Sequence, residues 1–334
     1  MIILVYDMAL HSLQIKRQTI RMKLPPLKSL WMLVAALGFA IMGALVKIGA
    51  AKFSPSELVF YRSFFGLIAI YAYIYAKKLP LKTPVLYKQM SRALVGFISL
   101  VLFFYAIAHL NLATAITLNY TSPLFLAMFM PFLLHQEYKQ NLLKRILTVA
   151  IIIGFVGVVL LLKPTLHSND ALAGALGLAS GAGAAIAYIF VKQLANLSEP
   201  DWRTVFYFTL VSSIASGAWM LLSPLFEPAG ATFITGYTLL SGFTPINSKD
   251  LVLLLGLGLS ATIAQLAMTR AYRTGNTLTV ASLAYVTVVL ASLFGVLFWQ
   301  EQLSNAEWLA IALIILSGII SIYATNAADK KTTK

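Results

Sequence analysis

Four polar residues stand deep inside otherwise apolar segments, where they could bind a solute. Asn119 and Tyr120 occur near the middle of one such segment, shortly before Pro123, and Gln265 and Tyr285 lie in two later segments. An amide offers hydrogen-bond donors and an acceptor, and a phenol combines a hydroxyl with an aromatic face. We expect Asn119 and Gln265 to recognise the polar groups of a solute by hydrogen bonding. We expect Tyr120 and Tyr285 to stack on it or to hydrogen-bond it.

Pro123 is the expected helix break of this site. Proline has no backbone N–H and removes one helical hydrogen bond, so the helix can open next to Tyr120. Carriers often line their cavities with such discontinuous helices. The alternative is a simple kink, whose freed groups are satisfied by Ser and Thr hydroxyls and by neighbouring helices. Each tyrosine, taken singly, could equally be a buried residue bonded to a carbonyl.

Three further residues are secondary candidates. Tyr105 is expected behind the main binding residues. Lys47, near the end of the first apolar segment, either contacts a solute carboxylate or extends to the lipid headgroups, and the second reading is favoured. Arg62 in the second segment either gates the mouth of the cavity or pairs with Glu57, five residues earlier. Structural pairing is the favoured reading.

The sequence lacks the motifs of several other chemistries. It has no Gly-x4-Gly-Lys-Ser/Thr phosphate loop, no His-Glu-x-x-His motif and no cysteine. ATP hydrolysis, disulfides and thiolate metal sites are therefore not expected, and we expect no cofactor, no metal and no enzyme activity. The Asp and Glu residues fall almost entirely between the apolar segments or at their ends. Proton coupling usually needs a carboxylate at membrane depth, so we expect facilitated diffusion or exchange.

The elements that must position these residues are ten apolar segments. The chain is 60% hydrophobic and only 11% charged, with a mean hydropathy of +0.84. A hydrocarbon core about 30 Å thick needs about 20 helical residues, and lipid offers no partner to an open backbone, so each segment should be a helix. The expected spans are 30–49, 56–75, 92–108, 112–133, 146–162, 171–194, 204–222, 251–271, 277–299 and 308–324.

The positive charges sort by side. With the N-terminus inside, most of the 25 Lys and Arg residues fall in the inner gaps, whereas the 11 Asp and Glu residues divide almost evenly. This is the form of the positive-inside rule, so we expect an inner-membrane protein with both termini cytoplasmic. The net charge of +14 then reflects topology and contact with lipid headgroups. Nucleic acid is not expected as a partner.

The chain repeats itself once. Residues around the fourth apolar segment recur at one constant separation around the ninth, and each repeat contains five spans. Because five is odd, the second repeat must cross the membrane upside down, which is a signature of alternating-access carriers. Tyr120 and Tyr285 would then face each other across a central cavity. The alternative is a duplication kept for a symmetric scaffold. The matched residues are Ala106, Thr114, Leu118, Tyr120 and Phe129 with Ala271, Thr279, Leu283, Tyr285 and Phe294.

The predicted organisation follows from the repeat. We expect a cytoplasmic arm, a first repeat, a second repeat and a cytoplasmic tail, at residues 1–28, 29–164, 170–326 and 327–334. Met22 directly precedes Lys23 and the first apolar segment. Residues 1–21 are therefore expected to be either a mis-assigned start or a mobile arm.

An ordered series of short motifs carries a family resemblance. It comprises Arg92-Ala93-Leu94-Val95-Gly96, Tyr120-Thr121-Ser122-Pro123, Gly154-Phe155-Val156-Gly157, Lys163-Pro164, Thr269-Arg270-Ala271-Tyr272 and Glu301-Gln302-Leu303. No single motif is specific, but the series over residues 28–326 resembles the EamA-type branch of the drug/metabolite transporter superfamily. The resemblance implies a ten-helix secondary transporter of small metabolites, and in most described members an exporter or exchanger.

Taken together, the sequence predicts an all-α integral membrane carrier with ten transmembrane helices in two inverted five-helix repeats. Its expected partners are a small organic solute, most simply an amino acid or related metabolite, and membrane lipids. It is expected to act as a monomer or homodimer. Two other classes remain open: a membrane enzyme acting on lipid-linked substrates, which would need clustered acids, histidines or a nucleophile, and a non-transporting scaffold or sensor.

Overall fold

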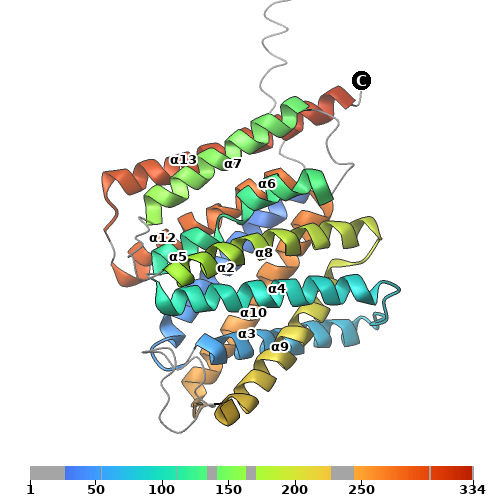
Figure 1. Ribbon diagram of the computed structural model, residues 1–334, viewed down its shortest axis with the longest axis vertical. Helices are drawn as coiled ribbons and strands as arrows, with labels where there is room; N and C mark the ends of the chain where they lie inside the picture. The colour runs from blue at the N-terminus through green and yellow to red at the C-terminus, as the bar shows by residue number, and fades with distance from the viewer. Residues whose placement is uncertain are drawn as a thin grey trace, which may run out of the picture.

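The computed structural model describes residues 27–53, 55–110, 112–133, 141–162, 171–226, 244–300 and 302–332, and nearly all of these residues are helical (Figure 1). No strand occurs among them. The helices are α2 (Leu27–Gly49), α3 (Pro55–Ala76), α4 (Leu86–His109), α5 (Leu112–Asn119), α6 (Ser122–Leu133), α7 (Asn141–Leu162), α8 (Ala171–Asn196), α9 (Asp201–Phe226), α10 (Ser248–Thr274), α11 (Thr277–Ala284), α12 (Val286–Trp299) and α13 (Asn305–Thr332).

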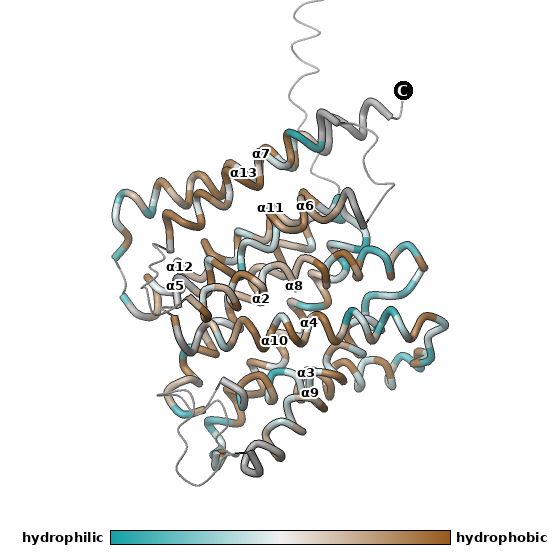
Figure 2. Tube along the Cα trace, viewed as in Figure 1, coloured by the Kyte–Doolittle hydropathy of each residue, from teal (hydrophilic) through white to brown (hydrophobic). Residues whose placement is uncertain are grey.

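The helices have the length and composition of membrane spans. Within the described ranges, nine helical stretches are long and apolar enough to cross a bilayer. The remaining span is divided between α5 and α6 and contains a shorter apolar stretch, Ala115–Met130. Figure 2 shows hydrophobic residues along the middle of the bundle and hydrophilic residues at helix ends and connections. The chain is a multi-pass membrane protein.

The helix pairings come in symmetry mates. The first span of each half packs on the third span of the other, as α2 on α10 and α8 on α4, while α3 packs on α9 and α7 on α13. Glycine permits the close approach at both first–third crossings. A Cβ on Gly38 would lie 2.9 Å from the Cβ of Ala264, and one on Gly183 would lie 3.0 Å from the Cβ of Ser99. The prediction of two inverted five-helix repeats is confirmed.

One face of the bundle is called here the N-terminal face. It carries the start of α2, the α3–α4 connection, the α8–α9 connection, the α10–α11 turn and the end of α13, which gather at the right of Figure 1. The other end is the opposite face. The seam is the surface along which the two halves meet between these faces.

Two spans are broken at equivalent tyrosines. The first break lies between α5 and α6 at Tyr120 and Thr121, where Thr121 N donates to Leu118 O at 3.2 Å. The second lies between α11 and α12 at Tyr285, whose N–H donates to Ser282 O at 3.4 Å. Pro123 follows the first break in the opening turn of α6, where a missing N–H costs no hydrogen bond. Because the second break has no such proline, the tight turn itself defines both positions.

Small residues keep these breaks covered by protein. A Cβ on Gly181 of α8 would lie 2.8 Å from the carbonyl oxygen of Leu118, beside the first break. A Cβ on Gly154 of α7 would lie 2.6 Å from the Tyr285 ring at the second break. Irregular backbone at membrane depth is tolerated only where protein or water covers it, and these two close approaches provide the protein.

Several helix boundaries differ from the expected spans. The third span was expected from Arg92 but begins at Leu86, because Gln89 and Arg92 are buried rather than solvated. The last helix continues through most of the expected tail, as far as Thr332. Most of the expected N-terminal arm, residues 1–26, lies outside the described residues.

Replacing Gly181 with Leu should lower the free energy of unfolding by about 1–3 kcal/mol, because the new side chain meets the carbonyls of the first break. Thermal unfolding of the purified protein in detergent measures this as a fall in the midpoint. The matched control is Gly43→Leu, where no atom lies within 4 Å of a Cβ, so the midpoint should hold or rise. Equal midpoints for the two variants would contradict the close packing of α8 on the break.

Candidate functional site

Two arginines converge on one phenylalanine at the seam. Arg62 of α3 and Arg92 of α4 are 8% and 2% exposed. Their guanidinium carbons lie 5.9 Å and 4.3 Å from the ring centre of Phe208 in α9. Both arginines belong to the first half of the chain and the phenylalanine to the second. The seam thus holds two cations against one aromatic face.

Neither arginine has a carboxylate partner among the described residues. Nε of Arg62, and Nε and Nη1 of Arg92, are buried without a hydrogen-bond acceptor. The expected Arg62–Glu57 pair does not form, because residues five apart on a helix do not face each other. The Glu57 carboxylate instead accepts hydrogen bonds from the Thr244 backbone N–H at 2.6 Å and from the Thr244 hydroxyl at 3.0 Å.

A small cavity joins Arg62 to Gln265. Its volume is about 10 Å³, which is room for a single water, and it is also bordered by Phe208 and Thr262. Gln265 of α10 is 4% exposed, and its side-chain Nε2 has no partner. Two residues singled out separately in the sequence therefore share one polar pocket at the seam.

The seam also holds four tyrosines. The rings of Tyr120 and Tyr285 lie 6.4 Å apart at 37°, and those of Tyr188 and Tyr272 are stacked at 4.8 Å. All four belong to the largest hydrophobic cluster. Tyr120 and Tyr285 thus face each other as the repeat predicts, but they touch instead of bordering an open chamber. The Tyr285 hydroxyl is buried without a partner.

Three of the sequence candidates lie away from this pocket. The Asn119 amide donates to the Ser180 hydroxyl of α8 at 3.1 Å, so it fastens the first break to its neighbour. Tyr105 packs against the cluster around Leu110, near the opposite face. Lys47 is exposed in the last turn of α2.

The sequence candidates did not include Arg92 or Phe208. Arg92 follows a run of lysines and was counted as a charge of the inner gap. A usable signal was the helical spacing of Gln89, Arg92, Gly96 and Ser99, which places polar and small residues on one face. Phe208 carries no such signal, because its role depends on arginines from two other helices.

A larger cavity, called here the side cavity, lies between α3, α4 and α9. It measures about 200 Å³. Val59 and Ser216 on its wall lie about one helical turn from Arg62 and Ser212, on the side of the opposite face. Trp219 and Val101 are about half exposed, so the cavity opens at the bundle surface. Its lining residues are Val59, Phe97, Val101, Phe104, Ala215, Ser216 and Trp219.

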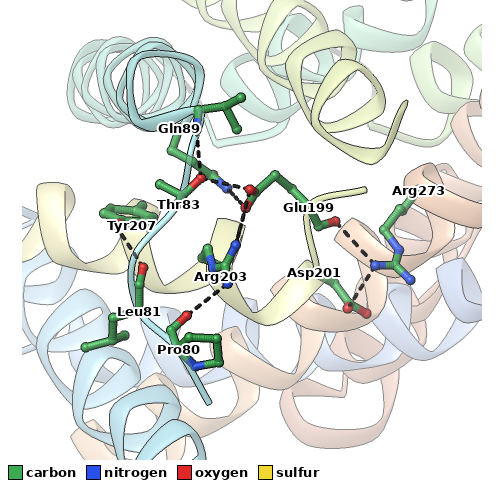
Figure 3. Close-up of polar contacts among 10 residues, drawn as sticks. Pro80, Leu81, Thr83, Gln89, Glu199, Asp201, Arg203, Tyr207 and Arg273 are labelled. Carbon is green, nitrogen blue, oxygen red and sulfur yellow. Dashed lines mark hydrogen bonds and ion pairs between the residues drawn. The ribbon is translucent and has the colours of Figure 1, made fainter. Parts of the chain in front are cut away.

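A polar network, called here the inner latch, closes the seam at the N-terminal face (Figure 3). The Glu199 carboxylate accepts hydrogen bonds from Thr83 Oγ1 at 2.8 Å, Gln89 Nε2 at 3.0 Å and Arg203 Nη1 at 3.0 Å. Glu199 and Arg203 are both buried. Arg203 Nη2 also donates to Pro80 O at 2.9 Å. The inner latch therefore ties the α3–α4 connection to the start of α9.

The opposite face has an equivalent contact. Glu57 at the start of α3 binds Thr244, which precedes α10, and an ion pair joins Lys52 to Asp250 nearby. On both faces the start of a second span binds the segment before the third span of the other half. The seam is closed at both ends in this conformation.

This architecture defines a class of protein: a helical membrane transporter with two inverted repeats, broken helices at mid-membrane and a polar seam that closes at each face. The chain belongs to the EamA-like transporter family, which matches residues 27–163 and 172–323. The family resemblance seen in the sequence is thereby confirmed, and the protein is a transporter of the drug/metabolite transporter type.

Named relatives agree with this assignment. An uncharacterized transporter of Helicobacter pylori (strain J99) is 30% identical over 86% of this chain and 92% of its own. The pseudopaline exporter CntI of Pseudomonas aeruginosa (strain UCBPP-PA14) is 28% identical over 89% of this chain and 94% of its own. A protein of known crystal structure shares the fold at a TM-score of 0.73, with 19% identity over 91% of this chain and 99% of that one.

Replacing Arg203 with Gln should loosen the inner latch, because Glu199 loses its charged partner and the α3–α4 connection loses the bond at Pro80. The chain has no cysteine, so Ser63→Cys at the seam pocket can report access. The maleimide labelling rate of this cysteine in detergent should rise several-fold in the Arg203→Gln background. The unfolding midpoint should fall, since breaking a buried ion pair costs about 3–5 kcal/mol.

The control for the latch is Asp201→Asn, which removes a more exposed pair with Arg273 at 3.7 Å. Exposed pairs contribute about 0–1 kcal/mol, so labelling should stay near the parent rate. Slow labelling in folded Arg203→Gln protein would show that the network does not close the seam.

Proposed function

We propose that the protein moves a small organic metabolite, an amino acid or related solute, across the cytoplasmic membrane by alternating access, as an exporter or exchanger. The observation that carries the proposal is the polar seam. Partnerless side chains from both halves meet there, inside the bundle. Unsatisfied polar groups are costly inside a membrane protein, so they favour a binding role over a purely structural one.

The equivalent contacts at the two faces support alternating access. Each binds a different pair of segments, so one can open while the other stays closed. The tight turns at Tyr120 and Tyr285 give the flanking half-helices freedom to tilt. In this mechanism the tyrosines separate when one face opens, and their hydroxyls and rings become available to the solute.

The orientation proposed here places the N-terminal face in the cytoplasm. The α3–α4 connection on that face carries Lys77, Lys78 and Lys82. Lys and Arg concentrate on cytoplasmic connections, so both chain termini would be cytoplasmic. The name of the Pseudomonas relative as an exporter supports movement out of the cell.

Transport without enzyme activity is the favoured reading. An enzyme acting on lipid-linked substrates would need an acid or nucleophile free to react at one face. The buried carboxylates of the described part, Glu57 and Glu199, are instead held in hydrogen bonds that close the two faces. Because both carboxylates hold contacts at the two faces, neither is assigned to carry a proton. We therefore propose exchange or facilitated diffusion as the mode of transport.

Tyr285→Phe provides a sharp test of this function. The variant keeps the ring packing and removes a buried hydroxyl that has no partner, so stability should not fall. If the hydroxyl binds the solute when the seam opens, flux should drop about tenfold, as expected for a lost hydrogen bond of about 1.4 kcal/mol. Counterflow of a panel of labelled amino acids and their derivatives into proteoliposomes measures it.

The control for that test is Tyr71→Phe, which removes a hydroxyl from a half-exposed ring of α3 and should leave flux unchanged. Absence of counterflow for the whole panel in the parent protein would contradict an amino-acid carrier. Equal flux in the parent and Tyr285→Phe proteins would remove this tyrosine from the solute site.

A further inference from the structure

We propose that the solute is an organic anion: its carboxylate or phosphate group binds Arg62 and Arg92, and its apolar body occupies the side cavity. This inference names the substrate class of the proposed carrier and rests on that function. Carboxylate and phosphate share the oxyanion chemistry that a guanidinium fork recognises, and the experiment below separates them.

The polar groups at the seam are rich in donors. Several buried N–H groups have no hydrogen-bond acceptor: those of Arg62 Nε, of Arg92 Nε and Nη1, and of Gln265 Nε2. The hydroxyls of Ser212 and Ser213 on α9 are buried without partners as well. A site whose unsatisfied atoms are mainly cationic and amide N–H groups is complementary to a ligand that brings oxygen acceptors and negative charge.

Two other structured arginines, Arg203 and Arg270, show how the bundle accommodates a cation. Arg203 is buried and its Nε also lacks a partner, but its Nη1 and Nη2 bind the Glu199 carboxylate and the Pro80 carbonyl. Arg270 lies over the Trp31 ring at 4.6 Å and is exposed. Arg62 and Arg92 also lie over an aromatic ring, but they are buried and have no carboxylate partner among the described residues. A charge at the centre of a span costs about 2.5–3.5 kcal/mol on insertion scales, so a buried pair without a counter-ion among the described residues indicates one supplied from outside.

The surroundings keep both guanidinium groups in position. A Cβ on Gly96 would lie 3.0 Å from Arg92 Nη1 and 3.2 Å from the Phe208 ring, so glycine leaves the space in which they stack.

The side cavity supplies the second half of the recognition. It begins about one helical turn from Arg62, and Phe97, Phe104 and Val59 make its wall apolar. Its volume of about 200 Å³ suits a small hydrocarbon or aromatic body. An inorganic anion would leave it empty, and a cation would be repelled by the two arginines. The arrangement therefore selects a solute with one anionic end and an apolar body.

Four probes with one phenylethyl body and different heads test the assignment: 3-phenylpropionate, 2-phenylethyl phosphate, 3-phenylpropionamide and 2-phenylethylamine. A ligand that binds only the folded protein raises its unfolding midpoint. At millimolar concentration, 3-phenylpropionate, 2-phenylethyl phosphate or both should raise the midpoint of the detergent-purified protein, and the amide and amine should not. A response to one anion alone identifies that oxyanion as the recognised group.

Arg62→Gln and Arg92→Gln should each weaken the anion-induced shift by at least tenfold in apparent affinity. Without ligand, their midpoints should not fall below that of the parent protein, because each variant removes an unpaired buried charge; a structural role would lower them. The matched control is Arg270→Gln, which removes an exposed arginine stacked on an aromatic ring outside the pocket of Arg62 and Gln265, and it should keep the full shift.

The proposal is overturned if neither anion shifts the midpoint, if the amide shifts it as much, or if both arginine variants keep the anion effect. Counterflow separates this result from the carrier function. Flux of neutral or cationic solutes that is equal in the parent and both arginine variants would leave the carrier standing and remove the anion site. Arginine-dependent anion binding without counterflow of those anions would support the site and count against the carrier.

Discussion

A polar group in hydrocarbon must find its partner inside the protein, and this constraint governs the whole bundle. It makes the spans helical, and it brings Gly181 and Gly154 against the two places where the helices break. It also explains why the buried Glu199 carboxylate of the inner latch accepts hydrogen bonds from three side chains. Arg62 and Arg92 depart from this rule, and that departure is the ground for proposing a binding role for them.

Because of the inverted symmetry, the same helix packing occurs twice, once in each orientation. Because α2 packs on α10 as α8 packs on α4, any tilt available to one half is available to the other in the reverse sense. The contacts at the two faces follow the same plan with different residues. The inner latch is a buried ion pair with side-chain and carbonyl partners, whereas the described contacts at the opposite face are those of buried Glu57 with Thr244 and the ion pair of Lys52 with Asp250.

The sequence was sufficient to predict features that follow from hydropathy and from the internal repeat. It was not sufficient where side chains distant in the sequence come into contact. Span length, the two-fold repeat and the facing of Tyr120 and Tyr285 follow from hydropathy and from a constant separation, and the structure contains all three. Arg92 was taken as a headgroup anchor because a cation near the end of an apolar segment usually is one. Its burial depends on Phe208, which lies in the other repeat, and on Gly96, which leaves room for the stack. Asn119 was placed in the site for its chemistry, yet its amide is used by Ser180, a contact that no linear pattern reveals.

The arginine pair bears on how the carrier would cycle. In the closed conformation both guanidinium groups are buried and lie against one aromatic ring, which attracts a cation more weakly than a carboxylate or phosphate does. Closing the seam over an oxyanion pairs these charges, whereas closing it without one leaves them desolvated and mutually repelling. If the arginines bind an anion as proposed, the loaded protein would pass through the closed state at lower free energy than the empty one. It would then return across the membrane more readily with a second anion than without, so the proposed site would favour exchange over one-way diffusion.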